Sequence, residues 1–514
     1  KLMKHKAPFI KKFCDRKKNY YMYDVNTNKL VKANSIVKDV IDLIHSYSIE
    51  DIINRFRDKY SPNDIAQGVD EIYSYINKYG LFLQNRPSRI EFGLGREEIR
   101  EKLMREVKGI TLNVTNNCNL ACKYCPICNN NANAKIIHRK NMEKDVALSA
   151  VDFFFRHSER VRGKEKIISF YGGEPLLNME VIRACVEHVR IKYNEYYKNI
   201  HFVISTNGTL LDDDIVHYLV DNKIGLQISI DGPENVHNEN RVFKNGTGSF
   251  EIIIKNLERI QKKFKDYYNN FILFKAVIAP QYDLLGTDDF FFGGSRHQIC
   301  NLDESKVVFN YVFTYKTNYL KQYKISEITK RFKEQQGIVF NDFMNKLIEK
   351  EIVKPSLGKK LMSKMLYKIY KRKYDIKMPE NWIFNSFCIP GGLKPFIDEE
   401  GKIGICESTG SGISIGDIYN GYYIDKIIGL IEQVMRICNE KCRNCWAIRF
   451  CNICFTWLIY NDEIDKNKMN HMCRNLKRTI INAFLWYLYI LERKPKAFEI
   501  LFDEKNIKGG EECV

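Results

Sequence analysis

From Gly109 onward the sequence alternates between short apolar runs, typical of buried strands, and longer segments with helical periodicity. The apolar runs predict strands at 110–115, 166–171, 201–206, 224–230, 271–278 and 307–313. The periodic segments predict helices at 144–156, 178–193, 212–222 and 249–264. Repeated strand–helix units build a parallel sheet with crossover helices, either an open doubly wound sheet or a barrel. The predicted fold class is therefore α/β.

Distinctive residues follow four consecutive strands of this predicted sheet. The first strand leads into Cys118-Asn-Leu-Ala-Cys122-Lys-Tyr-Cys125, and the second ends in Phe170-Tyr-Gly-Gly-Glu-Pro175. The third ends in Ser205-Thr-Asn-Gly208, and the fourth in Ser229-Ile-Asp-Gly-Pro233. In a parallel barrel the chemistry belongs at the C-terminal ends of the strands. All four motifs are therefore expected at one rim.

The three cysteines of the first motif are one short of the four that usually hold a 4Fe–4S cluster, which leaves one iron open. Clustered thiols favour metal over disulfides in a reducing cell. The sequence therefore predicts an iron site that binds a further ligand.

The other rim residues suit an amino-acid and nucleoside ligand. Gly172-Gly173 lets the backbone approach a ligand closely, and Glu174 can accept hydrogen bonds from an ammonium group. Arg241 can bind a carboxylate through two parallel hydrogen bonds. Asn207 and Ser229 can bind ribose hydroxyls. S-adenosylmethionine carries all of these groups, and its amino and carboxylate groups can chelate the open iron.

Together these motifs resemble the radical S-adenosylmethionine superfamily over roughly residues 109 to 315. The resemblance implies a partial (β/α)6 barrel, a 4Fe–4S cluster on Cys118, Cys122 and Cys125, and cleavage of S-adenosylmethionine to a 5′-deoxyadenosyl radical. It places the cofactor contacts at Tyr124, Gly172, Gly173, Glu174, Asn207, Ser229 and Arg241. Cys128 is outside the family pattern and is interpreted as an unrelated loop thiol.

The segment 1–95 predicts a separate module. Alternating residues over 20–25 and 29–32 flank the turn Asn26-Thr-Asn28, and three helical segments follow, the third from Ser61 to Tyr79. This order is typical of a winged-helix-like module, with 87–96 as a linker. The module is either a scaffold or a peptide-binding element whose exposed strand edge takes an extended peptide.

Residues 316–385 predict a basic helical connector, with helices at 326–350 and 359–373. The formal net charge of the chain is +18, which permits an acidic peptide partner or an evenly solvated surface. The apolar run 480–491 is too short to span a bilayer and predicts a packed C-terminal helix, with a tail, over 481–514. With no secretory signal in view, we expect a cytoplasmic protein without a membrane partner.

A second group of cysteines lies in the segment 386–480. Its members are Cys388, Cys406, Cys438, Cys442, Cys445, Cys451, Cys454 and Cys473. A hairpin that turns at Glu400-Gly401 is predicted between the first two. Eight thiols suffice for two iron–sulfur clusters or two zinc sites, so the count leaves both open.

The spacing of these cysteines resembles the SPASM extension of radical enzymes that modify peptides, which carries two auxiliary 4Fe–4S clusters. The resemblance assigns Cys442, Cys445, Cys451 and Cys473 to the second cluster, and Cys388, Cys406 and Cys454 to the first. Only two residues separate Cys451 from Cys454, where the family usually has three. The fourth ligand of the first cluster is either Cys438 or a substrate thiolate. Glu407 occupies the position of a candidate base in sulfatase-maturing relatives, and is otherwise an exposed hairpin residue.

The combination of a winged-helix-like module, a radical barrel and a SPASM domain resembles ribosomal-peptide maturases. We expect an enzyme of the sactipeptide or ranthipeptide type. It would bind a leader peptide, install Cys thioether cross-links in a precursor peptide and receive electrons from a flavodoxin or ferredoxin. The alternatives are a carbon–carbon cross-linking maturase, an anaerobic sulfatase maturase, for which residues 1–95 are superfluous, and a zinc-containing nucleic-acid-binding protein.

Overall fold

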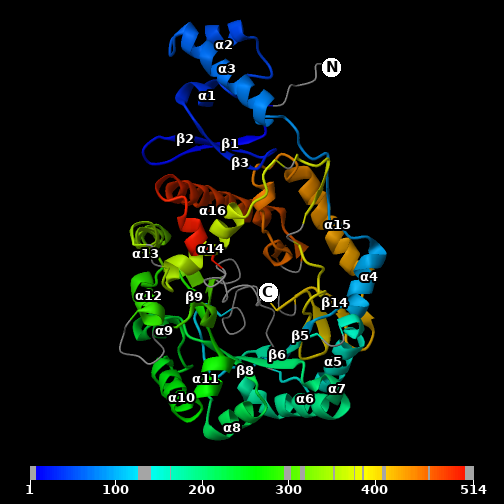
Figure 1. Cartoon of the computed structure of the whole chain (residues 1–514). Helices are drawn as coiled ribbons and strands as arrows, with labels where there is room; N and C mark the ends of the chain where they lie inside the picture. Colours follow the sequence, from blue (N-terminus) through cyan, green and yellow to red (C-terminus); the bar gives the residue numbers. More distant parts are fainter. Residues whose placement is uncertain are drawn as a thin grey trace. The chain divides into compact units, whose positions relative to one another are not determined.

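The chain is represented by a computed structural model (Figure 1) that describes residues 7–125, 140–161, 164–293, 302–312, 319–350, 353–375, 377–384, 387–407, 412–460 and 463–503. Cys128 lies outside the described residues. The chain divides into two compact units. Unit 1 comprises Lys1–Leu94, Lys364–Cys388 and Ile428–Glu492, and unit 2 comprises Gly95–Ser363, Ile389–Ile427 and Arg493–Val514. Both units join segments far apart in the sequence. The expected division into five consecutive domains, with the barrel over 96–315, stays a prediction.

A ten-stranded sheet forms the centre of unit 2. Six of its strands are parallel and pair in chain order: β5 (Gly109–Thr115), β6 (Lys166–Gly172), β7 (Ile200–Thr206), β8 (Gly225–Ser229), β9 (Ile272–Ile278) and β10 (Val307–Tyr311). They match the six predicted strands to within two residues at each end. In β9, buried and half-buried residues alternate, so that one face carries Phe274 and Ala276 and the other Lys275 and Val277.

Helices connect these strands and lie around the outside of the sheet (Figure 1). The main crossover helices are α5 (Lys144–Arg156), α6 (Met179–Lys192), α8 (Asp213–Asp221) and α10 (Phe250–Lys263). Shorter or later helices of unit 2 are α4 (Arg96–Arg105), α7 (Asn194–Tyr197), α9 (Glu234–Asn240), α11 (Lys265–Phe271), α12 (Leu284–Phe292), α13 (Ile325–Glu349) and α17 (Ala497–Leu501). These helices bury apolar faces, such as Ile253, Leu257 and Ile260 of α10. The α/β fold is thereby confirmed.

The predicted hairpin after Cys388 is present, and it extends the parallel sheet. Its first strand, β12 (Phe396–Ile397), pairs parallel with β5, and β13 (Lys402–Gly404), β14 (Ser414–Asp417) and β15 (Gly421–Tyr422) follow antiparallel. Gly401 has φ +82°, a left-handed turn conformation that favours glycine. The C-terminal cysteine region therefore contributes strands to the central sheet.

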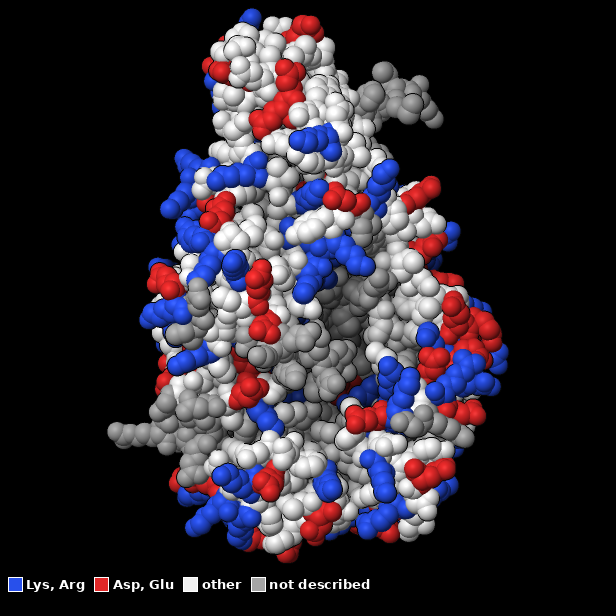
Figure 2. Space-filling model, viewed as in Figure 1, with Lys and Arg blue, Asp and Glu red and all other residues white. Residues whose placement is uncertain are grey.

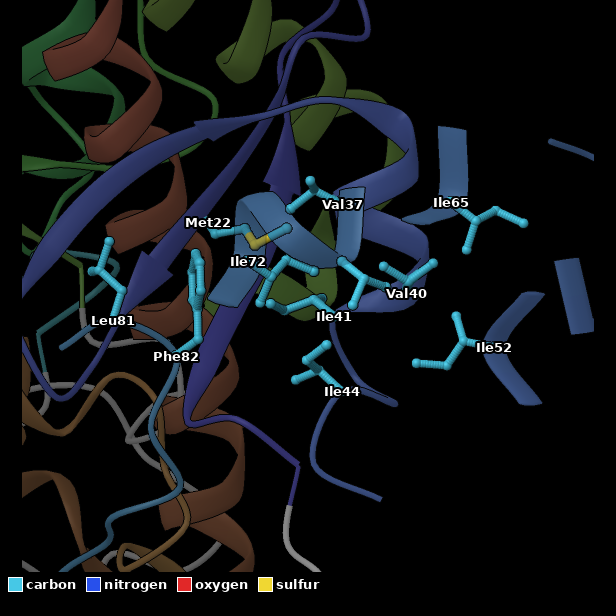
Figure 3. Packing of buried hydrophobic residues seen from close by; sticks show 11 residues of the cluster. Met22, Val37, Val40, Ile41, Ile44, Ile52, Ile65, Ile72, Leu81 and Phe82 are labelled. Carbon is cyan, nitrogen blue, oxygen red and sulfur yellow. The ribbon is translucent and has the colours of Figure 1, made fainter. Parts of the chain in front are cut away.

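Unit 1 contains the three-stranded antiparallel sheet β1 (Ile10–Cys14), β2 (Tyr20–Asp24) and β3 (Lys29–Ala33), with β2 in the middle. Three helices follow, as predicted: α1 (Ser35–Val40), α2 (Ile49–Phe56) and α3 (Pro62–Tyr79). Ser48 and Ser61 cap α2 and α3 by accepting backbone N–H groups. Figure 3 shows Met22 of the sheet in one core with apolar residues of all three helices, among them Val40 and Ile72.

The same sheet packs against the C-terminal helix α16 (Lys466–Arg493) of unit 1. The Tyr23 ring lies 4.9 Å from the ring of Phe484 and 5.5 Å from that of Phe450. The guanidinium of Arg449 donates hydrogen bonds to the backbone oxygens of Val25, at 2.6 Å, and Asn26, at 3.0 Å. The N-terminal module and the cysteines of unit 1 thus belong to one packed body.

Two predicted boundaries in unit 1 differ from the structure. The 87–96 linker contains a strand, β4 (Arg89–Glu91), which pairs parallel with β11 (Asn381–Ile383). The C-terminal helix begins at Lys466 rather than at 481, and so includes Cys473. The remaining long helices are α14 (Leu357–Tyr370) and α15 (Ile424–Lys441), and a small hairpin joins β16 (Ile459–Tyr460) to β17 (Glu463–Ile464). Among the described residues, no helix combines the length and apolarity needed to cross a bilayer.

Candidate active site and cysteine-lined cavity

The cysteine triple lies on the loop that follows β5. Cys122 is buried, whereas Cys118 and Cys125 are half-buried. Burial raises the pKa of the Cys122 thiol to about 12; the Arg241 charge opposes this, and the other two thiols add to it. The backbone of the loop pairs with the chain that follows α9, where Ala121 N–H donates to Val242 O at 2.8 Å. The three thiols therefore lie close together on a loop held against the segment that carries Arg241.

A buried carboxylate, Asp231, joins this loop to the rim. It accepts hydrogen bonds from the Tyr124 hydroxyl at 2.6 Å, the Tyr282 hydroxyl at 3.1 Å and the Val277 N–H at 3.0 Å. It also pairs with Arg241, whose Nε lies 3.0 Å away. Sequence analysis assigned no role to Asp231, although it lies within the fourth strand-end motif.

Arg241 is itself buried, and its guanidinium lies 5.5 Å from the centre of the Tyr124 ring. Asp231 takes the Nε hydrogen, and no described residue accepts a hydrogen bond from the Nη groups. The predicted function of Arg241, binding a carboxylate, is therefore compatible with its position.

The glycine pair and Glu174 pack against the cysteine loop. A Cβ on Gly172, which has φ +141°, would lie 2.1 Å from Thr115 O, and one on Gly173 would lie 2.2 Å from Asn117 O. Gly173 N–H donates to Thr115 O at 2.7 Å. The glycines are thus required for contact between two loops of the protein, in addition to any contact with a ligand.

The Glu174 carboxylate is already bonded within the protein, which sequence analysis did not anticipate. It is fully buried and accepts hydrogen bonds from Asn207 N–H, Thr206 Oγ1 and Leu176 N–H at 2.7, 2.7 and 3.1 Å. Burial raises its pKa to about 7, and these donors act in the opposite direction. The carboxylate joins the ends of β6 and β7, and its predicted contact with an ammonium group stays a prediction.

Asn207 and Ser229 remain at the rim. The amide nitrogen of Asn207 lies 4.0 Å from the Cys118 sulfur and donates to Asn119 Oδ1 at 2.8 Å. Ser229 is half-buried at the last position of β8, opposite Lys275 in the register of the sheet. Both predicted residues thus lie at the strand ends from which they would reach a bound ligand.

The hairpin of the C-terminal region also reaches this rim. Glu399 accepts hydrogen bonds from the side-chain amides of Asn113, at 2.9 Å, and Asn116, which directly precedes the cysteine loop. Further along, half-buried Glu407 lies 3.9 Å from the ammonium of Lys394. Burial, together with the charges of Glu407 and Cys125, raises the pKa of the Tyr171 phenol to about 12. The candidate base Glu407 is therefore electrostatically coupled to the rim.

In unit 1, the four cysteines assigned to the second auxiliary cluster line one cavity: Cys442, Cys445, Cys451 and Cys473. Burial raises the pKa of the Cys451 thiol to about 12 and that of the Cys473 thiol to about 11, and the neighbouring thiols add to both shifts. The remaining wall is apolar apart from Lys477. Tertiary structure therefore brings together four thiols that are distributed over 32 residues of sequence, from Cys442 to Cys473.

The other predicted cysteines are placed differently. Cys438 is fully buried on α15, one turn before Cys442, and contact between the two thiols is the main factor raising the pKa of Cys442. Cys438 therefore lies beside the four cysteines that line the cavity. Cys388 and Cys454 belong to unit 1 and Cys406 to unit 2, so their assignment to one cluster stays a prediction.

The donor sets fit iron–sulfur clusters. Among the described residues, no three His, Cys, Asp or Glu side chains converge as the ligands of one ion do. Cysteine ligands of a four-iron cluster bind separate irons and need no common point. Three thiols on one loop and four around one cavity are the sets that such clusters use.

Comparison with known proteins supports the first of these sites. Residues 112–277 match the radical SAM superfamily. The radical SAM cyclopropyl synthase TigE of Paramaledivibacter caminithermalis is 29% identical over 259 residues, covering 48% of this chain and 49% of that protein. A cysteine-type anaerobic sulfatase-maturating enzyme of Clostridium novyi is 31% identical over 170 residues, covering 32% and 43%.

A solved structure of native anSMEcpe with bound AdoMet has the same fold, with a TM-score of 0.50 and 19% identity over 76% of this chain and 98% of that one. The chain spans less than half the length of the curated relatives above. The matched region holds the cysteine triple and all four strand-end motifs. Residues 112–277 are therefore a domain of the radical SAM superfamily.

Proposed function

We propose that this chain is a radical S-adenosylmethionine peptide maturase that binds a leader peptide and installs Cys thioether cross-links in a precursor peptide. The observation that carries the proposal is the composition of unit 1. There the three-stranded module packs on α16, the helix that also supplies Cys473 to the four-cysteine cavity. A module with two edge strands beside a cluster-sized set of thiols suits an enzyme that acts on peptides.

The relatives support this class without identifying the product. TigE is described as a cyclopropyl synthase, and the Clostridium enzyme as a maturase of sulfatases. A second anSMEcpe structure of the same fold, with a TM-score of 0.50, contains AdoMet and a Cys peptide. A cysteine-bearing peptide substrate for this chain is therefore part of the proposal.

In the proposed site, Cys118, Cys122 and Cys125 would hold the cluster, and the Nη groups of Arg241, from which no described residue accepts a hydrogen bond, would bind the carboxylate of S-adenosylmethionine. Asn207 and Ser229 provide its remaining polar contacts. When bound, the cluster and S-adenosylmethionine would together supply the abstraction of a hydrogen atom from a C–H bond of the substrate. The buried network around Asp231 keeps Tyr124 and Arg241 in place while substrates exchange.

The balance of the reaction defines what the rest of the chain must do. Joining a thiol S–H to a C–H bond as a thioether removes one hydrogen atom, one proton and one electron from the peptide. Glu407 would take the proton. The four-cysteine cavity of unit 1 would accept the electron, and an external flavodoxin or ferredoxin would supply the reducing electron that each turnover begins with.

The test uses the reconstituted full chain, S-adenosylmethionine, a reductant and the cysteine-bearing precursor peptide encoded beside it. Each thioether should lower the peptide mass by two hydrogens and remove one thiol from alkylation by iodoacetamide. Consumption of S-adenosylmethionine with an unchanged peptide mass would contradict the proposal. Loss of two hydrogens with every thiol still alkylated would instead indicate the carbon–carbon cross-linking maturase.

Metal content separates the enzyme from the nucleic-acid-binding alternative. Three four-iron clusters require about twelve irons per chain, and the protein should be brown under anaerobic conditions. A colourless protein that contains zinc and binds DNA would exclude the maturase. The charges give that alternative little support, because lysine and arginine are interspersed with acidic residues over the visible face (Figure 2).

A further inference from the structure

The four-cysteine cavity of unit 1 contains one feature that cluster binding by itself does not require. Lys477 lies one helical turn after Cys473 on α16 and lines the cavity. The other lining residues besides the cysteines are apolar, among them Phe387, Ile448 and Leu476. Among the described residues, no carboxylate lies within ion-pair distance of its ammonium group.

A half-buried ammonium without a carboxylate is unfavourable unless another anion compensates it. Among the described residues that line the cavity with Lys477, the four thiols are the groups that can carry negative charge. Lys477 shares this wall with Cys442, Cys445 and Cys473, the last of which precedes it by one turn of α16. Lys477 is therefore directed toward the group that the cysteines would hold.

The surrounding cations differ from Lys477 in one respect. Lys441 directly precedes Cys442 in the sequence, but its ammonium donates to Asn470 Oδ1 at 2.9 Å and it does not line the cavity. Lys368, on α14, lies near Cys451 and is also outside the lining residues. These two lysines provide charge from outside the wall, whereas Lys477 is part of it.

We propose that Lys477 raises the reduction potential of the four-iron cluster held by Cys442, Cys445, Cys451 and Cys473, so that this cluster accepts the electron removed from the peptide. The inference rests on the proposed function. Reduction adds one negative charge to the cluster, and a nearby cation stabilises that charge more than the oxidised state. Net charge and hydrogen bonds to sulfur are established determinants of such potentials.

The test is a potentiometric titration of the reconstituted full chain, followed by electron paramagnetic resonance. A Cys118→Ala/Cys122→Ala/Cys125→Ala background removes the radical cluster. The signal that disappears with Cys473→Ser belongs to the cavity. Lys477→Gln should move the midpoint of that signal to a more negative potential with unchanged iron content. Lys477→Arg should restore it, and Lys441→Gln should leave it near the parental value.

The outcomes distinguish failure of the proposed auxiliary clusters from failure of the role of Lys477. If the background protein holds no iron, or zinc instead, the auxiliary clusters of the proposed function fail, and the role of Lys477 fails with them. If iron is present and the midpoint of Lys477→Gln equals the parental one, only the role of Lys477 is overturned.

A second neutral variant covers loss of the cluster. Should Lys477→Gln lose iron, Lys477→Met keeps the length of the side chain without its charge. Iron loss in both neutral variants, with retention in Lys477→Arg, supports the need for a cation. Iron loss in all three variants shows a packing role and overturns the proposal.

Discussion

At the scale of single residues, the site depends on buried polar groups that the motif positions alone did not identify. Asp231 has no exposed surface, yet its carboxylate accepts hydrogen bonds from four donors in unit 2. One of these donors, Tyr124, lies inside the cysteine triple. Asp231 is therefore the residue through which the cysteine loop and Arg241 are held together.

Asp231→Asn should destabilise unit 2 by about 3–5 kcal/mol, because it leaves the buried Arg241 without a countercharge. Tyr282→Phe removes one of the four donors and should cost about 1 kcal/mol. Chemical unfolding of the cluster-free protein measures both, and calorimetry should show weaker S-adenosylmethionine binding to reconstituted Asp231→Asn. Equal stability of the two variants would contradict this role for Asp231.

The burial of His237 predicts that the free energy of unfolding depends on pH. Burial lowers its pKa from 6.5 to about 3, and the ring is bonded to Ser249 Oγ at 2.9 Å. Below pH 6.5 the unfolded chain binds a proton that the folded protein excludes, so stability falls as the pH decreases. Between pH 7 and 5 the loss should be about 2 kcal/mol.

The measurement compares unfolding at pH 7 and pH 5 for the parental chain and two variants. His237→Gln should be less stable at pH 7 but should lose less stability on acidification. His217→Gln changes an exposed residue of α8 and should keep the parental pH dependence. A pH dependence unchanged in His237→Gln would exclude His237 as its origin.

At the scale of elements, two features matter for the proposed function: a hairpin that connects distant parts of the chain, and a sheet with two edge strands. The hairpin β12–β13 joins the central sheet beside β5 and places Glu399 against Asn113 and Asn116. The three-stranded sheet of unit 1 presents β1 and β3 as its edges. The hairpin supports the cysteine loop, and the edges of the three-stranded sheet offer a surface for an extended peptide.

Glu399→Ala should loosen the start of the cysteine loop, because two side-chain amides lose their acceptor. We expect faster loss of radical-cluster iron to a chelator, followed by the decay of the cluster absorbance. Glu400→Ala is the matched control, since it removes only exposed ion pairs with Lys140 and Lys402, which contribute little. Equal rates in the two variants would show that Glu399 does not support the loop.

A leader peptide that adds a strand to the sheet should protect the backbone amides of β3 from hydrogen exchange. We favour β3 because the chain entering β1 already pairs with Leu83 O, whereas both strands carry two lysines. Exchange with and without the leader is read by mass spectrometry, with β1 as the internal control. Protection confined to β1, or absent from both strands, would contradict this prediction.

At the scale of the whole molecule, unit 1 is assembled from three separate parts of the chain. Its N-terminal part covers Phe450 and Phe484, and its hairpin turn receives the Arg449 guanidinium. Arg449 and Phe450 directly precede Cys451. The N-terminal module is therefore structurally required by the cysteine region, whatever peptide it binds.

Removal of residues 1–94 should consequently fail to give a smaller, intact enzyme. The exposed aromatic surface should reduce solubility, and the truncated chain should lose the iron of the four-cysteine cavity. Iron content, assayed with the Cys118→Ala/Cys122→Ala/Cys125→Ala background as reference, measures the effect. A soluble truncated chain with parental iron content would show that the module is separable from the cysteine region. The alternative of an anaerobic sulfatase maturase requires that result.

The strand–helix alternation and the spacing of the first three cysteines were predicted from sequence because both depend on local patterns. Strand β5 is a continuous buried run, and Cys118, Cys122 and Cys125 lie on one loop. Glu174 was predicted at a strand end, but the hydrogen bonds of its carboxylate were not, because Thr206 and Asn207 approach it only in the folded sheet.

The sequence by itself thus determined the α/β sheet, the rim motifs and the radical SAM domain, since each follows from periodicity or from residues close together in the chain. Tertiary structure decided the pairing of β12 with β5, the Asp231 network, the meeting of four cysteines with Lys477, and the packing of the N-terminal sheet on α16. These features depend on long-range contacts, whose partners are chosen by the fit of whole surfaces and leave no spacing signal in the chain.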